Sequence, residues 1–193
     1  MKLKLPDCFS PYQGVIYFVV VLIITHFFWK FTMVGDESDD VVTFFGLNLT
    51  GFFNFMSTHT AQVSTKILQI FNPEVQLLPH NMIKHGNGEA VRIIWACTGI
   101  KQAYIFIFII ALYRGPWKKK LWFIPLGVAV VYLFNIFRIT AIAALVENHA
   151  DIFDFVHGYL LKYLFYSVIF GLWVWWEEKI SGNNAKKNRA EGK

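Results

Sequence analysis

The sequence predicts an all-α, polytopic helical membrane protein with about four transmembrane helices and an extracytoplasmic amphipathic segment. Of its 193 residues, 55% are hydrophobic and 18% aromatic, and the mean hydropathy is +0.43. Several apolar runs approach the roughly 20 residues that cross a bilayer. Basic residues gather beside these runs, as topology signals do. We interpret residues 1–193 as a single membrane domain.

The net charge of +5 is interpreted as an orientation signal. Basic residues flanking a span stay in the cytoplasm, and here they cluster near both ends of the chain and at Lys118, Lys119 and Lys120. We therefore expect cytoplasmic termini and no nucleic-acid partner. The two cysteines, Cys8 and Cys97, are expected on opposite sides of the membrane, so neither a disulfide nor a Cys-rich metal site is predicted. No cofactor is expected.

The first predicted span covers residues 12–34. Trp29 and Lys30 near its far end are ordinary interface anchors. His26 lies one turn deeper, and we interpret it as a hydrogen-bonded packing residue. Residues 35–95 are then expected outside the membrane, beginning with an acidic cluster at Asp36, Glu37, Asp39 and Asp40.

Residues 41–71 are expected to form an amphipathic helix on or dipping into the outer leaflet. A true span here would reverse the downstream topology and place Lys118–Lys120 outside, against the positive-inside rule. The dipeptide Asn87-Gly88 predicts the turn of a small hairpin that leads toward Cys97. Three further spans are predicted at residues 96–113, 121–146 and 156–176, followed by a polar, disordered cytoplasmic tail at 177–193.

Three unusual residues fall at one membrane depth in this topology. Arg138 follows the inner boundary at Lys120 by 18 positions, or about 27 Å of helix, in a hydrocarbon core about 30 Å thick. It therefore lies near the outer interface, where Cys97 and His157 begin two other spans. A guanidinium inside a span is costly, and by default it marks a functional site.

These residue types suit thiol chemistry. Cys97 is the candidate nucleophile and His157 its base, while Arg138 would stabilise an oxyanion. Nearby positive charge would favour the thiolate. Three supporting residues follow from spacing: Lys101 is at i+4 from Cys97, Asn135 shares a helix face with Arg138, and Asp154 could orient His157. His149 is the rival histidine.

Two of these segments resemble sequence signatures of one family. Residues 96–100, Ala-Cys-Thr-Gly-Ile, resemble the Ala-Cys-Ser-Gly-Ile signature of exosortases and archaeosortases. Residues 135–139, Asn-Ile-Phe-Arg-Ile, resemble their Asn-x-x-Arg-(Ile/Val) block, and His157 matches the third catalytic position. The resemblance covers about residues 85–176. Thr98 replaces the commoner Ser, and the chain is shorter than larger members, most like the Bacteroidetes-type forms.

The resemblance implies a multi-pass cysteine transpeptidase or protease of the bacterial inner membrane, with an active site facing the periplasm. Its substrates would be exported proteins with a C-terminal sorting signal, made of a short motif, an apolar helix and a basic tail. Cleavage would pass through a thioester, with Cys97 as nucleophile, Arg138 as oxyanion or substrate-orienting residue, and His157 as acid/base. Transpeptidation and hydrolysis both stay open, as does a small membrane partner protein that completes the substrate groove.

Two other functions are compatible with the sequence. A non-catalytic scaffold for envelope or polysaccharide assembly would tolerate loss of Cys97. A small haem cytochrome would use His26 with His149 or His157, although His26 has no clear mate for axial ligation. A transporter is disfavoured because the sequence has no inverted repeat.

Overall fold

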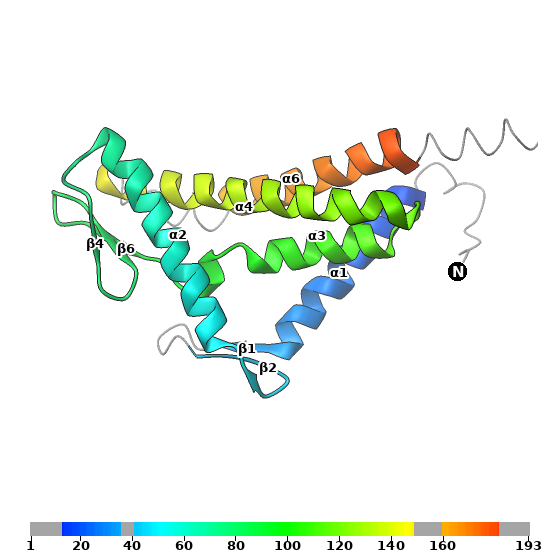
Figure 1. The fold of residues 1–193 in the computed structure, drawn as a ribbon, viewed down its shortest axis with the longest axis horizontal. Helices are drawn as coiled ribbons and strands as arrows, with labels where there is room; N and C mark the ends of the chain where they lie inside the picture. The colour runs from blue at the N-terminus through cyan, green and yellow to red at the C-terminus, as the bar shows by residue number, and fades with distance from the viewer. Residues whose placement is uncertain (1–12, 36–40, 149–159, 182–193) are drawn as a thin grey trace, which may run out of the picture.

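The computed structural model describes residues 13–35, 41–148 and 160–181, and these are mostly helical (Figure 1). Five α-helices, a 3-10 turn and a C-terminal π-helix are present in this part of the chain: α1 (Gln13–Thr32), α2 (Thr50–Phe71), η2 (Trp95–Cys97), α3 (Ile100–Leu112), α4 (Trp117–Asn148), α6 (Leu161–Trp175) and η5 (Trp176–Ser181). The predicted helical class is therefore correct.

Two of the helices, α1 and α4, are long and apolar enough to cross a membrane. The outer face of α1 carries large apolar side chains that no protein group covers, including Ile24 and Phe31. An exposed apolar face of this kind suits contact with lipid. α3 is apolar but has only 13 residues. The described residues thus give two candidate spans by length and composition, compared with the four expected.

Several boundaries differ from those expected. The expected span at 96–113 begins as a helix only at Ile100, because Gly99 has a left-handed backbone with φ of 76° and separates α3 from η2. α4 begins at Trp117, before the expected residue 121. The tail was expected to be disordered from residue 177, but its first residues are ordered. η5 continues the chain as helix to Ser181, and Ile180 is buried.

The predicted amphipathic helix at 41–71 is partly correct. Residues before Thr50 form two short strands, and α2 starts there. The buried face of α2 is rich in small polar residues, including Thr60 and Ser64, while Phe52 and Phe55 are exposed. Small residues let helices approach closely, and this face of α2 packs on α4.

Two small antiparallel sheets complete the fold. One has the order β1-β2-β3 and the other β4-β5-β6, with strands β1 (Met33–Gly35), β2 (Val42–Phe44), β3 (Leu47–Asn48), β4 (Gln76–Leu78), β5 (Met82–Lys84) and β6 (Ala90–Arg92). β5 pairs with β6 across a loop that contains Asn87-Gly88, so the predicted hairpin is confirmed.

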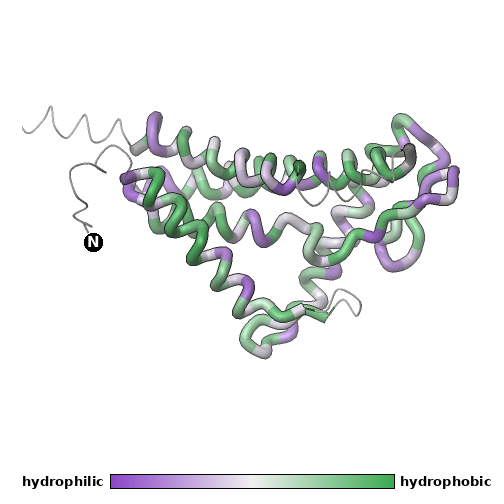
Figure 2. The backbone as a smooth tube through the Cα atoms, turned by 180° about the vertical axis from the view of Figure 1, so that it is seen from behind, coloured by the Kyte–Doolittle hydropathy of each residue, from purple (hydrophilic) through white to green (hydrophobic). Residues whose placement is uncertain are grey.

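The helices contact one another in a continuous bundle, in which α3 touches α1, α4 and α6. The start of α1, the α3–α4 connection and η5 lie at one end, and the β4–β6 sheet lies at the other (Figure 1). Figure 2 shows hydrophobic stretches along the helices and hydrophilic ones gathered around the β4–β6 sheet. One core cluster, with Ile109, Phe165 and Trp176, fills the first end. A second, with Ile83, Ile139 and Leu161, lies toward the β4–β6 sheet.

Candidate active site

Cys97 lies in a tight turn just before α3. Its N–H donates to the Ile94 carbonyl at 2.9 Å, and the Thr98 hydroxyl donates to the Trp95 carbonyl at 2.8 Å. Thr98 is buried and Cys97 is half-buried, packed against the second core cluster. The turn therefore holds the cysteine outside the regular helix, next to its first turn.

α4 fixes this turn from the side. The Asn135 side-chain amide donates to the Cys97 carbonyl oxygen at 2.9 Å, although 38 positions separate the two residues. Gly99 packs so closely on Asn135 that a Cβ there would come within 2.8 Å of its Cγ. Asn135 is completely buried. It is thus a structural contact between α4 and the backbone of Cys97.

Arg138 lies almost one turn further along α4 and is only 8% exposed. It interacts electrostatically with Cys97 and with Tyr166 on α6. Its Nε has no hydrogen-bond partner among the described residues. Burying a guanidinium whose N–H has no acceptor lowers the stability of the fold, unless a ligand or a further residue accepts a hydrogen bond from it. The structure therefore brings Cys97, Asn135 and Arg138 together.

A group of positive charges lies beside the turn. Lys101, on the first turn of α3, is close enough to Lys30 and Lys162 for mutual electrostatic repulsion, and His26 lies near all three. These side chains come from α1, α3 and α6. A cavity of about 280 Å³ opens here and is lined by Trp29, Lys30, Met33, Phe53, Trp95, Ala96, Thr98 and Lys101. Its lining includes both neighbours of Cys97 in the sequence.

The predicted histidine and its orienting carboxylate cannot be placed in this arrangement. His157, Asp154 and the rival His149 lie outside the described residues. Leu161, four positions after His157, belongs to the core cluster on which Cys97 packs.

The sequence analysis missed Tyr166. Its hydroxyl lies 3.5 Å from Nδ1 of His26, and the residue lies near Arg138. A single tyrosine in an apolar helix gives no distinctive signal, so only the packing of α6 against α1 and α4 reveals it. The contact supports the interpretation of His26 as a packing residue. In the described part of the chain, no group of three or more His, Cys, Asp or Glu side chains could hold a metal ion.

Comparison with known proteins identifies the family. Residues 41–175 match the family model of the transmembrane exosortase (Exosortase_EpsH). No curated protein and no solved structure matches the chain. The matched range includes α2, the Cys97 turn, α3, α4 and all of α6, which is more than half of the sequence. The chain therefore belongs to the transmembrane exosortase family, and it is a helical membrane protein of the transpeptidase type.

Proposed function

We propose that this protein is a membrane-embedded cysteine transpeptidase or protease that processes C-terminal sorting signals of exported proteins at the extracytoplasmic face. The observation that carries the proposal is the convergence of Cys97 and Arg138, with Asn135 holding the Cys97 backbone. The Cys97 thiol lies in the turn before α3, beside a buried guanidinium. This arrangement suits attack on a carbonyl.

The proposed reaction begins with the Cys97 thiolate. It attacks the scissile carbonyl carbon, the C=O electron pair moves to oxygen, and Arg138 stabilises that oxyanion. The oxyanion collapses, the C–N bond breaks, and the leaving amine takes a proton from His157. A thioester on Cys97 results. An acceptor then attacks the thioester, gives its proton to His157 and releases the thiolate. An amine acceptor gives transpeptidation, and water gives hydrolysis.

His157 enters this scheme as the acid/base because of its sequence position. Four residues of chain span at most about 14 Å, and Leu161 packs in the cluster that Cys97 contacts. Asp154 is proposed to orient the imidazole. Lys101 is proposed to favour the thiolate, because it lies on the first turn of α3 and faces the cavity beside Cys97.

The orientation in the membrane follows from charge. Arg114 and Lys118–Lys120 lie at the α3–α4 connection, at the end of the bundle away from the Cys97 turn. Positive flanks stay in the cytoplasm, so the proposed site faces the periplasm from the bacterial inner membrane. Exported proteins with a sorting signal are the proposed substrates.

The rate of Cys97 alkylation against pH tests this proposal. An impermeant maleimide is added to spheroplasts that carry the protein in a Cys8→Ser background. We expect fast labelling whose rate reaches half its maximum below pH 8.5, the approximate midpoint of an ordinary thiol. Arg138→Ala and His157→Ala should each move that midpoint upward, and Lys118→Ala, at the other end of the bundle, should leave it in place.

Slow labelling with an ordinary midpoint, insensitive to both substitutions, would contradict the proposal and favour the scaffold. In that case Cys97→Ala should also leave envelope assembly intact. Labelling of Cys97 only from the cytoplasmic side would show that the protein has the opposite orientation in the membrane. An absorbance spectrum of the purified protein distinguishes the haem alternative, because a bound haem gives a strong Soret band.

A further inference from the structure

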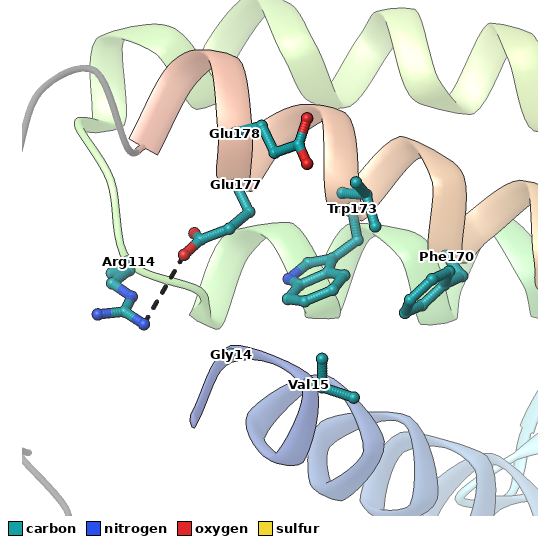
Figure 3. A pocket seen from close by; sticks show the side chains of 8 residues that line it. Gly14, Val15, Arg114, Phe170, Trp173, Glu177 and Glu178 are labelled. Carbon is teal, nitrogen blue, oxygen red and sulfur yellow. Dashed lines mark ion pairs between the residues drawn. The ribbon is translucent and has the colours of Figure 1, made fainter. Parts of the chain in front are cut away.

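A second cavity lies at the end of the bundle opposite the Cys97 turn. It has a volume of about 400 Å³, within the range of about 300–1,000 Å³ for pockets that hold small organic groups. The start of α1, the α3–α4 connection and the end of α6 with the start of η5 surround it (Figure 3). Arg114, Trp173, Glu177 and Glu178 are among the residues that line it. We call it the Glu177 cavity.

Trp173 places an unused hydrogen-bond donor at this cavity. The residue is only 3% exposed, and its indole N–H has no acceptor among the described residues. Figure 3 shows the indole between Gly14 and Glu177, with its nitrogen toward the Arg114 side. Burying an N–H without an acceptor lowers the stability of the fold. The cavity therefore suits a ligand that accepts a hydrogen bond from Trp173.

Two carboxylates give the cavity negative charge. The Oε2 atom of Glu177 is buried and has no hydrogen-bond partner in the described part of the chain. Its Oε1 atom lies 3.8 Å from the Arg114 guanidinium, near the limit of an ion pair. Glu178 is exposed and adds the second carboxylate on the rim (Figure 3). A cation that also donates hydrogen bonds would complement both carboxylates and satisfy the buried oxygen of Glu177.

Arg114 supplies the opposite charge. The Trp176 indole donates a hydrogen bond to the Arg114 carbonyl oxygen at 3.1 Å and so holds its backbone in place. The Arg114 side chain is 60% exposed, which leaves the guanidinium accessible to a ligand. Guanidinium groups bind phosphate oxygens through paired N–H donors. The complementary ligand therefore carries a phosphate and a cation close together.

The surroundings of the cavity place it at a membrane boundary. Trp117 and Trp175 are exposed at this end of the bundle, and so is Lys118. Trp residues gather at the membrane–water interface, and Lys residues flank the spans there. Charged lipid headgroups occupy this level of the bilayer, so they are the phosphates and cations nearest to the cavity.

An apolar surface continues from the cavity along two helices. Val15 of α1 and Phe170 of α6 both line the cavity and are exposed. Val19, one turn further along α1, extends the exposed apolar face. The two helices touch here through the rings of Phe18 and Phe170, whose centres lie 5.3 Å apart. A charged cavity that continues into apolar helix faces fits an amphiphile, with its headgroup in the cavity and its acyl chains along the helices.

The buried Glu177 oxygen discriminates between phospholipids, because it needs a donor. Phosphatidylethanolamine has a phosphate and a primary ammonium group, which carries N–H donors. Phosphatidylcholine has the same charges but no N–H, and phosphatidylglycerol has no cation for the two carboxylates. We propose that the Glu177 cavity binds the headgroup of an aminophospholipid of the phosphatidylethanolamine type. Its ammonium group lies at Glu177 and Glu178, and its phosphate lies at Arg114 and accepts from the Trp173 indole.

This inference depends on the membrane location of the chain and not on the proposed catalysis. A lipid bound in the Glu177 cavity would contact the start of α1, the α3–α4 connection and the end of α6 together. Because it binds the folded bundle and not the separated helices, it would stabilise the fold by mass action. The stability of the protein would then depend on the headgroup composition of its membrane.

Native mass spectrometry of the full chain in detergent measures the binding. The ligands are phosphatidylethanolamine, its N-methyl and N,N-dimethyl derivatives, and phosphatidylcholine, all with the same acyl chains. Each added methyl group replaces one N–H donor and keeps the charge. We expect the affinity to fall along this series by about tenfold, the loss that corresponds to one hydrogen bond to a charged group. Phosphatidylglycerol should bind no better than phosphatidylcholine.

Substitutions locate the effect. Glu177→Gln and Glu178→Gln should each reduce the preference for phosphatidylethanolamine over phosphatidylcholine, and the double variant should bind the two lipids equally. Arg114→Gln should weaken both lipids and leave their ratio unchanged, because both carry the phosphate. Glu89→Gln changes an exposed carboxylate between β5 and β6 and should keep the full preference. Thermal unfolding without added lipid separates loss of the site from loss of the fold, and Glu178→Gln is the safer variant because Glu178 is exposed.

Equal affinities along the methylation series would overturn the inference, and so would a preference that survives in the double variant. Tighter binding of phosphatidylglycerol than of phosphatidylethanolamine would indicate a simple anion site at Arg114 and also overturn it. Glycerophosphoethanolamine, the same headgroup without acyl chains, should not compete at equal concentration. Full competition by it would assign the cavity to a soluble zwitterion and overturn the lipid assignment. Cys97→Ala should bind lipid like the parent protein, so failure of the alkylation test would contradict only the proposed catalysis.

Discussion

The side-chain amide of Asn135 donates a 2.9 Å hydrogen bond to the carbonyl oxygen of Cys97. This bond joins the middle of α4 to the turn before α3. It also places Arg138, which follows Asn135 by three positions, on the side of α4 that faces the cysteine. The pairing of the two helices thus sets the position of the candidate nucleophile.

The first prediction concerns this bond. Asn135→Ala removes the donor and leaves the Cys97 carbonyl without this partner, so we expect a loss of about 1–3 kcal/mol of stability. The time course of Cys97 alkylation should also depart from a single exponential, because the turn that carries the cysteine is no longer held in one conformation. Thermal unfolding in detergent and labelling kinetics measure the two effects. Unchanged values of both would show that the contact does not hold the turn.

A second prediction concerns Gly99. Its φ of 76° favours glycine, and a Cβ would press against Asn135 at 2.8 Å. Gly99→Ala should therefore cost about 1–2 kcal/mol from the backbone alone and displace Cys97 relative to Arg138. Gly171→Ala on α6 is the matched control, because nothing lies within 4 Å of its added Cβ. A stable and fully reactive Gly99→Ala protein would contradict the assignment.

Two threonines on the inner face of α2 should respond in opposite ways. The hydroxyl of Thr60 is buried without a partner in the described chain, whereas that of Thr65 donates to the Ala61 carbonyl at 2.8 Å. Thr60→Val should thus be neutral or stabilising, and Thr65→Val should cost about 0.5–1.5 kcal/mol. Unfolding midpoints in one detergent compare the pair. The reverse order would show that a ligand or water satisfies Thr60.

Lys120 should have a structural role that the nearby Lys118 lacks. It is only 3% exposed, and its ammonium group donates to the carbonyls of Ala111 and Tyr113 at the end of α3. Lys120→Met removes both bonds and should cost about 2–3 kcal/mol. Lys118→Met, on an exposed side chain, should change stability by less than about 0.5 kcal/mol. Equal losses of stability in the two variants would indicate that Lys120 acts only through its positive charge, and not through its two hydrogen bonds.

Tyr166 should act as a positioning residue for Arg138. Tyr166→Phe removes a hydroxyl that lies near Arg138 and His26, so we expect Cys97 alkylation at neutral pH to slow by about twofold to fivefold, a change of roughly 0.4–1 kcal/mol. The fold should stay intact, because the ring is kept. Tyr163→Phe, on an exposed side chain of the same helix, is the control. If Cys97 is alkylated at the full rate in Tyr166→Phe, Tyr166 has no role in positioning Arg138.

Local pattern in the sequence was sufficient for several features. The composition predicted a helical membrane protein, Asn87-Gly88 predicted the β5–β6 turn, and the three-residue spacing placed Asn135 and Arg138 on one face of α4. The short motifs around Cys97 and Arg138 indicated the family that the comparison then identified. Each of these features depends on neighbours in the chain, which periodicity and turn chemistry constrain directly.

Only the tertiary structure decided which helices meet. In a membrane helix both the lipid-facing and the protein-facing sides can be apolar, so hydrophobicity does not show the buried face. For this reason the sequence did not indicate that Ser and Thr residues form the inner face of α2, or that Tyr166 lies near Arg138. Nor did it indicate that the chain stays helical past Glu177 and encloses a cavity with Arg114 and Trp173. These contacts join residues far apart in the sequence, and their energy comes from packing between elements that local propensity does not encode.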